Sequence, residues 1–323
     1  MSEQIGIVSG VHMFPIKSAQ EATINGQLPA ELTVGETGFV HDGFADRGIV
    51  IAGADMLFAS QRGWDNIDTE HEHKGYPKDS RLATVAVDIR GDHLAVTIPG
   101  QGTLEIGKPD TSIPSEEVEM FGNPFYGFDM GQEVNGRFSK LLDREVRLFW
   151  VDETKPRIIG DENYHRSDAV NRAAGADGFP FLIANLASLR DAHDKAEVPQ
   201  GTLPIAAYRA NVDMDTDQPW VEDKVRVVRI EEFAGYVVKA CSRCPIPNQD
   251  QTTGETHGLS NKLLRSIRMG RRSDQDPISA KAKIHFGQNV NHRVASVGSV
   301  VSEGDPIIVE EWGEPNFVQK IRD

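Results

Sequence analysis

The chain has 323 residues, 39% of them hydrophobic and 26% charged, which is enough to bury one large core or two ordinary ones. Its 49 acidic and 34 basic residues give a net charge of −15, which disfavours nucleic acid and anionic membranes as partners. An anionic ligand would therefore need a locally basic pocket. The N-terminus lacks a signal-peptide pattern and no segment approaches about 20 apolar residues, so we expect a soluble, cytoplasmic protein.

The first half of the chain predicts mostly strands. Short β-branched and apolar runs alternate with glycine-containing turns over residues 5–17 and 47–60. The clearest hairpin spans residues 81–98, where apolar and polar residues alternate on both sides of a Gly-Asp turn. Apolar residues at helical spacing predict a helix over residues 132–142, and a strand follows over residues 146–151.

The second half predicts further strands with a few helices. Residues 155–178 are polar and lack a clean period, which indicates a long loop near a domain boundary. Helices are expected over residues 186–195 and 259–269. The expected strands are 225–230, 235–240, 282–286, 298–301 and 307–311. The sum is a mainly β protein with some α, in which a few helices cover the strands.

The only two cysteines, Cys241 and Cys244, lie close together after a predicted strand. Two thiols at this spacing suit disulfide exchange or metal ligation, and Arg243 between them would favour the thiolate. A structural zinc site lacks a second cysteine pair, and His257 and His285 are poorly spaced to complete it. A thioredoxin-like pair would open a helix, whereas prolines follow here. Two buried, inert cysteines are a further alternative, and we favour a single metal-ligating thiolate.

Other short patterns carry less weight. His71 and His73 could form half of a metal site, but they lie in a polar segment that favours a solvated turn. No dinucleotide fingerprint, Walker-type segment or nucleophile elbow occurs, so nucleotide binding and serine hydrolysis lose their usual evidence.

Several polar side chains lie at the expected ends of strands. Lys17 and Ser18 end an early strand, Arg47 begins another, and Arg209 with Asn211 begins a third. A single basic residue in such a position is more often solvated than functional. Taken together with a thiolate, these donors could converge on one anionic ligand.

A series of short motifs spans nearly the whole chain. They are FPIKS at 14–18, DRG at 46–48, ASQR at 59–62, DGFPFLIANLASL at 177–189, YRAN at 208–211, CSRC at 241–244, FGQN at 286–289 and GDPI at 304–307. In order and spacing they resemble the MOSC family, named for the C-terminal domain of molybdenum-cofactor sulfurase, with its N-terminal β-barrel companion. The resemblance implies a β-barrel-like N-terminal domain over residues 1–125, a connecting helix, strand and loop over 126–175, and a MOSC β-barrel domain with covering helices over 176–323.

The resemblance also implies a molybdenum cofactor, Mo-molybdopterin. In similar bacterial members the second cysteine of the motif ligates molybdenum, which makes Cys244 the expected metal ligand and catalytic residue. The expected cofactor-binding residues are Lys17, Ser18, Arg47, Arg209, Asn211, Ser242 and Arg243. A soft thiolate suits molybdenum, and cationic donors suit a phosphate. Cys241 is expected to pack behind the site.

The implied activity is reduction of N-hydroxylated small molecules. An iron–sulfur cluster needs about four cysteines and none is spare, so the electrons would come from a separate reductase or ferredoxin-like protein. An alternative is a persulfide carrier or cofactor-delivery protein without reductase activity. A third is a binding protein for another anionic ligand.

Overall fold

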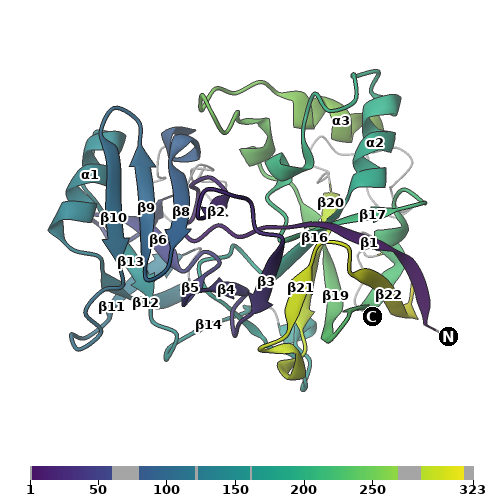
Figure 1. The fold of residues 1–323 in the computed structure, drawn as a ribbon, viewed down its shortest axis with the longest axis horizontal. Coiled ribbons are helices and arrows are strands. Elements are labelled where there is room, and N and C mark those ends of the chain that lie inside the picture. The colour runs from purple at the N-terminus through teal and green to yellow at the C-terminus, as the bar shows by residue number, and fades with distance from the viewer. Residues whose placement is uncertain (1, 60–79, 121–122, 161, 268–284, 316–323) are drawn as a thin grey trace, which may run out of the picture.

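The computed structural model describes residues 2–59, 80–120, 123–160, 162–267 and 285–315. The fold is mainly β with some α, as expected, and is built on a closed barrel (Figure 1). In spatial order the barrel strands are β1 (Glu3–Val11), β17 (Val212–Thr216), β16 (Phe181–Asn185), β20 (His285–His292), β19 (Phe233–Ser242), β18 (Val225–Ile230) and β22 (Pro306–Trp312). The predicted β-barrel architecture is thus confirmed for the second half of the chain.

Two helices, α2 (Leu186–Lys195) and α3 (Leu259–Ile267), lie together on one side of the barrel (Figure 1). The side chain of Asn185 caps α2 by accepting a hydrogen bond from the backbone N–H of Ala187 at 3.0 Å. Buried residues of both helices, including Leu189 and Leu263, share a core cluster with Phe286 of the barrel. The last two residues expected in α3 lie outside the described part of the chain.

The N-terminal half forms smaller sheets beside the barrel (Figure 1). One has the order β10 (Gly102–Gly107), β9 (His93–Ile98), β8 (Ala86–Arg90) and β2 (Ala22–Ile24). A second has β11 (Glu116–Met120), β12 (Asn123–Asp129), β13 (Val146–Val151), β6 (Ile49–Gly53) and β7 (Phe58–Ala59). A third has β21 (Val300–Ser302), β3 (Glu31–Val34), β4 (Phe39–His41) and β5 (Phe44–Ala45). Within the described ranges, none of these sheets closes into a barrel of its own.

The sheets do not follow the expected division of the chain at residues 125 and 175. The first strand, β1, lies in the barrel between β17 and β22. The strand β13, expected in the connecting segment, pairs with β6 in an N-terminal sheet, and α1 (Gln132–Leu142) packs on it. The chain therefore crosses between its two halves more often than three consecutive blocks would require.

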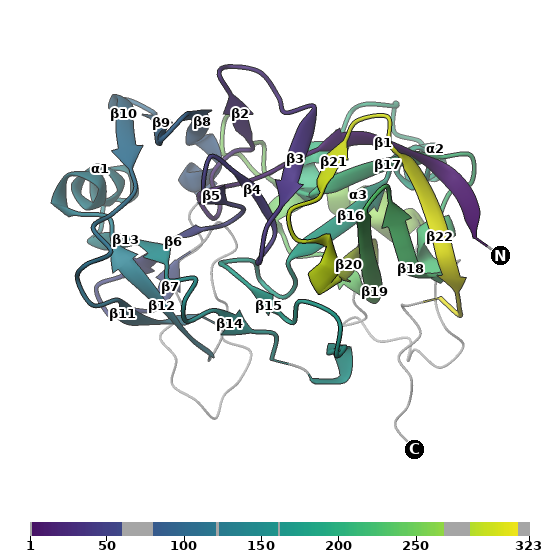
Figure 2. The same ribbon diagram turned by 60° about the horizontal axis from the view of Figure 1, so that its bottom comes forward.

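The expected long loop over residues 155–178 passes between the two halves (Figure 2). It contains two short paired strands, β14 (Arg157–Ile158) and β15 (Arg172–Ala173), and a 3₁₀ turn at Glu162–Tyr164. Its backbone bonds to both sides: Val170 N–H donates to the carbonyl of His292, and Gly175 N–H donates to that of Arg47, at 2.8 and 2.9 Å. Across the described residues, no helix is both long and apolar enough to cross a bilayer.

Candidate functional site

A cavity of about 390 Å³ opens where the barrel meets the N-terminal half. Eight of its lining residues are those singled out from the sequence: Lys17, Ser18, Arg47, Arg209, Asn211, Ser242, Arg243 and Cys244. The structure thus brings these predicted residues into one place, although Lys17 and Cys244 are 227 positions apart in the sequence (244 − 17). Their roles toward a cofactor stay predictions.

The N-terminal site residues lie in loops that lead into strands. Lys17 and Ser18 follow Ile16, which forms a parallel bridge with Ile49, so they lie well beyond the end of β1. Arg47 lies just before β6.

The barrel contributes two further donors from one loop. Arg209 ends a 3₁₀ turn over Ile205–Tyr208, and Asn211 directly precedes β17. Arg47 and Asn211 fit the expected positions before strands, whereas Lys17 and Ser18 do not end one.

Three of these residues have an unusual backbone. Ser18, Arg47 and Arg209 have φ values of 73°, 53° and 56°, in the left-handed region that side chains rarely adopt. Each costs about 1 kcal/mol or more, and such strain persists where the surrounding contacts enforce it. Arg47 and Arg209 are held by such contacts: Arg47 pairs with Asp46, and Arg209 donates a hydrogen bond to the carbonyl of Ala19.

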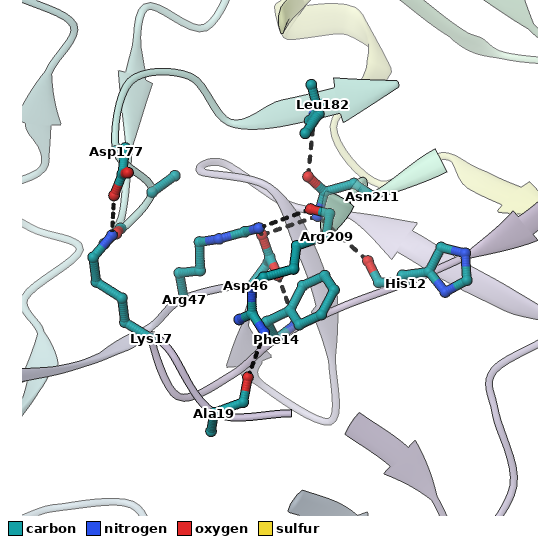
Figure 3. Close-up of polar contacts among 12 residues, drawn as sticks. His12, Phe14, Lys17, Ala19, Asp46, Arg47, Asp177, Leu182, Arg209 and Asn211 are labelled. Atoms are coloured by element: carbon teal, nitrogen blue, oxygen red, sulfur yellow. Dashed lines mark hydrogen bonds and ion pairs between the residues drawn. The ribbon is translucent and has the colours of Figure 1, made fainter. Parts of the chain in front are cut away.

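Asp46 is the centre of that network (Figure 3). Its carboxylate is 1% exposed, accepts a hydrogen bond from Phe14 N–H at 2.7 Å, pairs with the Arg47 guanidinium and accepts from Asn211 Nδ2 at 3.0 Å. Asp46 therefore holds two predicted site residues in place. The motif that contains Asp46 was recognised in the sequence, but this role was not. The available signal was that Asp46 directly precedes Arg47, a predicted basic ligand.

Two guanidinium groups lie against one aromatic ring. Their carbons are 4.9 Å for Arg47 and 4.1 Å for Arg209 from the centroid of Phe14. Arg47 donates to the carbonyl of Arg209 at 3.1 Å, and Arg209 donates to the carbonyl of Ala19 at 2.6 Å. Burial, together with the charge of Arg47, lowers the pKa of Arg209. Two like charges so close together favour an anionic ligand.

Lys17 lies on another side of the cavity and is also buried, with a side chain 7% exposed. Its ammonium donates to the carbonyl of Gly175 at 2.6 Å and pairs with the carboxylate of Asp177 (Figure 3). Burial lowers the pKa of Lys17, and the charge of Asp177 opposes that shift. Asp177 lines the cavity too, and this charged group was missed among the residues singled out from the sequence.

The two cysteines form the remaining edge, at the end of β19. Both line the cavity, both are partly exposed and neither is in a disulfide. The expectation that Cys241 packs behind the site is therefore wrong. Arg243 Nη1 lies 3.1 Å from Cys241 Sγ, because Arg243 Nη2 is held by the carbonyl of Tyr208 at 2.7 Å.

Arg243 links the two thiols electrostatically. Burial opposes the charge of Arg243, but the neighbouring Cys241 and Cys244 outweigh it and raise the pKa of the guanidinium. The Nε atom of Arg243 is buried and has no hydrogen-bond partner among the described residues, which leaves it able to donate to an acceptor in the cavity.

A site built from protein ligands alone finds no support here. In the part of the chain that the structure covers, no three His, Cys, Asp or Glu side chains group closely enough to hold a metal ion. His257 instead accepts from the N–H of Leu259 at 3.0 Å, at the start of α3. His71 and His73 lie outside the described residues.

The cavity is basic although the chain as a whole is acidic. Five basic side chains line it, Lys17, Arg47, Arg209, Lys239 and Arg243, and among the described lining residues the carboxylate of Asp177 alone opposes them. This excess of positive charge, next to a thiol of Cys244, fits a ligand with an anionic group and a thiophilic metal.

Comparisons with known proteins find several relatives of low sequence identity. The chain is 25% identical over 243 residues to molybdenum cofactor sulfurase of Danio rerio, covering 68% of this chain and 26% of that protein. It is 24% identical over 259 residues to mitochondrial amidoxime reducing component 2 of Rattus norvegicus, covering 78% and 69%. For mitochondrial amidoxime-reducing component 1 of Mus musculus the identity is 23% over 257 residues, covering 78% and 68%.

The chain thus spans about a quarter of the sulfurase and about two thirds of each amidoxime reducing component. The family model of the MOSC domain matches residues 170–308, which include most of the barrel and the cysteine pair. The expected companion domain in the N-terminal half stays a prediction. Over residues 170–308 the chain is therefore similar to MOSC domains.

Proposed function

We propose that this chain is a molybdenum-cofactor-binding oxidoreductase that reduces N-hydroxylated compounds with electrons from a separate reductase. The observation that carries the proposal is the cavity that Cys244 lines together with five basic side chains. The names of two relatives, both amidoxime reducing components, support the substrate class. The third relative is named for the molybdenum cofactor itself.

The residues of the cavity fit the cofactor's chemistry. Lys17, Arg47 and Arg209 would balance its phosphate, and the unpaired Nε of Arg243 would donate a hydrogen bond to its polar edge. Asn211, whose amide is held by Asp46 and the carbonyl of His12, would contact the cofactor as part of the cavity wall. Cys244 would supply a fixed thiolate ligand. When bound, the cofactor supplies two-electron redox chemistry at molybdenum.

The protein's own part is binding and orientation. Asp46 fixes the directions of Arg47 and Asn211 before any ligand arrives, so little ordering cost remains for binding. A cavity of about 390 Å³ lies within the range of about 300 to 1,000 Å³ of ligand sites. The net reaction takes up two electrons and two protons, replaces N–OH by N–H and releases water.

The test is elemental analysis for molybdenum on protein from a cofactor-producing host. We expect near-stoichiometric molybdenum in the wild type and at least a tenfold loss in Cys244→Ser, because the thiolate is the only fixed ligand proposed. Cys241→Ser is the matched control and should retain the metal. Loaded wild type should then reduce an aryl amidoxime when supplied with a flavin reductase and NADH.

Two results would contradict the proposal. One is no molybdenum in the wild type while a known molybdoenzyme from the same cells is loaded. The other is equal loss of metal in both cysteine variants, which would show that the pair acts through folding and not through one ligand.

A second candidate, a persulfide carrier, is favoured by one contact. Arg243 Nη1 lies 3.1 Å from Cys241 Sγ, and a cation at this distance would stabilise negative charge on a sulfur atom during transfer. Mass spectrometry after incubation with a cysteine desulfurase and cysteine would then show a gain of about 32 Da, the mass of one sulfur atom, on Cys244. Protein without molybdenum that gains no sulfur would rule out this candidate as well.

A further inference from the structure

The cavity lining contains an acidic side chain to which the proposed function gives no role. Five lining residues are basic, and Asp177 is the one acidic side chain among the described residues that line the cavity. Asp177 pairs with Lys17, one of the cations expected to bind the anionic ligand (Figure 3). The ammonium that should receive an anion is therefore already neutralised by a carboxylate of the protein.

The two ends of this ion pair differ in exposure. The side chain of Lys17 is 7% exposed, whereas that of Asp177 is 46% exposed. A buried ammonium without a counter-charge would be costly, so Lys17 needs an anionic partner at all times. The exposed carboxylate of Asp177 can instead rotate away from Lys17 and be hydrated by solvent at little cost in free energy.

Asp46 provides the contrast within the same cavity wall. It also pairs with a basic site residue, Arg47, but it is 1% exposed and is held by Phe14 N–H and Asn211 Nδ2. Removing Asp46 from its cation would leave these donors without their acceptor. Asp46 is therefore fixed within the cavity wall, whereas Asp177 is far more exposed to solvent.

The surroundings of Asp177 suit such an exchange. A Cβ atom added to its neighbour Gly178 would meet no other atom within 4 Å, so the loop is not packed tightly there. Lys17 also donates a hydrogen bond to the Gly175 carbonyl at 2.6 Å, which does not involve the Asp177 carboxylate. Asp177 also interacts with the charge of buried Arg157, which gives the displaced carboxylate a second cation nearby.

We propose that Asp177 is an exchangeable counterion of Lys17, displaced when an anionic group of the ligand, of the phosphomonoester class, binds the same ammonium. The inference rests on the proposed function for the nature of the ligand. Asp177 then acts as a specificity residue: a neutral group cannot replace the carboxylate on a buried cation, whereas a dianionic phosphate can. It also weakens binding of every anion, because the ion pair must first be broken.

The experiment measures binding of inorganic phosphate and of phenyl phosphate to cofactor-free protein by calorimetry, at pH 7.5 and constant ionic strength. Asp177→Asn should bind both roughly tenfold more tightly than the wild type, because no carboxylate competes for Lys17. In a Lys17→Met background the same substitution should change the affinity little, since the competed ammonium is gone.

Asp215→Asn is the matched control. Asp215 is 39% exposed, pairs with Arg190 at 2.5 Å and does not line the cavity, so its loss changes the net charge equally. Unchanged or weaker phosphate binding by Asp177→Asn would overturn the inference. Equal tightening in Asp215→Asn would also overturn it, because net charge alone would then explain the gain. Thermal melting of each variant checks that it is folded.

The outcome is separable from that of the proposed function. Tighter phosphate binding by Asp177→Asn in a chain that never retains molybdenum would support the inference and contradict the reductase proposal. If molybdenum retention depends on Cys244 but Asp177→Asn leaves the phosphate affinity unchanged, the inference is overturned and the reductase proposal is not.

Discussion

Two carboxylates, Asp46 and Glu222, are buried in different regions, and each needs partners that offset the cost of burying its charge. Glu222 is 0% exposed and accepts from Asn185 Nδ2 and Ser188 Oγ, at 2.8 and 2.7 Å. Asp46 is 1% exposed and accepts from Asn211 Nδ2 and from backbone, but its strongest partner is the cation Arg47. Each carboxylate bonds to a side-chain amide, and the second partner differs.

The difference separates a structural network from a functional one. The donors to Glu222 lie at the start of α2, so this network fixes a helix against the barrel. Two of the donors to Asp46, Arg47 and Asn211, line the cavity, so this network fixes side chains of the cavity wall. Buried polar clusters of similar composition therefore have different uses, which depend on whether their donors face a cavity.

The largest effect is expected from Asp46→Ala. It leaves the mostly buried guanidinium of Arg47 without its counter-charge and should lower the free energy of unfolding by about 3 to 5 kcal/mol. Phosphate binding should fall at least tenfold in the fraction that folds, because Arg47 and Asn211 lose their orientation. Urea unfolding and calorimetry measure the two effects, and Asp46→Asn should recover part of the stability. Wild-type phosphate affinity in Asp46→Ala would contradict the functional role.

A smaller effect is expected from Glu222→Ala. The substitution leaves the neutral donors of Asn185 and Ser188 unsatisfied and should cost about 1 to 3 kcal/mol in urea unfolding. Phosphate and molybdenum binding should not change, since Glu222 does not line the cavity. A tenfold loss of phosphate affinity in folded Glu222→Ala would break the distinction between the two networks.

The smallest expected effect is a pH dependence of stability that comes from His12, a residue next to the Asp46 network. His12 lies behind Asn211, which donates to its carbonyl at 3.3 Å, and its ring contacts Glu21 and Asp213 at 2.5 and 2.9 Å. Burial lowers the pKa of His12, but the two carboxylates outweigh it and raise the pKa to about 10.

Because the folded state holds this proton more tightly than the unfolded state, its stabilisation is complete below about pH 6.5 and is lost as the pH rises toward 10. The free energy of unfolding should therefore fall by about 1 kcal/mol between pH 7.5 and 8.5. His12→Gln, in which this group cannot titrate, should show a flatter profile. An equally steep profile in that variant would assign the dependence to other groups.

Local patterns predicted much of the fold. The helices over Gln132–Leu142 and Leu186–Lys195 have the bounds expected from their apolar spacing, and the strand Val146–Val151 also agrees. These elements depend on periodicity and caps within about 15 residues, which a sequence displays directly.

Long-range pairing was not predictable in the same way. The partners of Asp46 include Phe14 and Asn211, which are 32 and 165 positions away, and no local pattern announces such contacts. The cavity residues themselves were found from motifs of a resembling family, whereas Asp46 and Asp177, the acids that hold the bases, were missed. Their importance arises only when the loops are brought together.

The position of β1 has a consequence for how the protein is made. This strand is synthesised before every other strand of the barrel, yet its two neighbours there, β17 and β22, extend to Thr216 and Trp312. On the ribosome the barrel cannot close until residues up to Trp312 have emerged, and contacts so distant in sequence are slow to form. Until then the edges of β17 and β22 are open to pairing with other chains. A fragment cut to residues 170–308 would keep those edges open permanently, so β1 is the part that protects the barrel from such pairing.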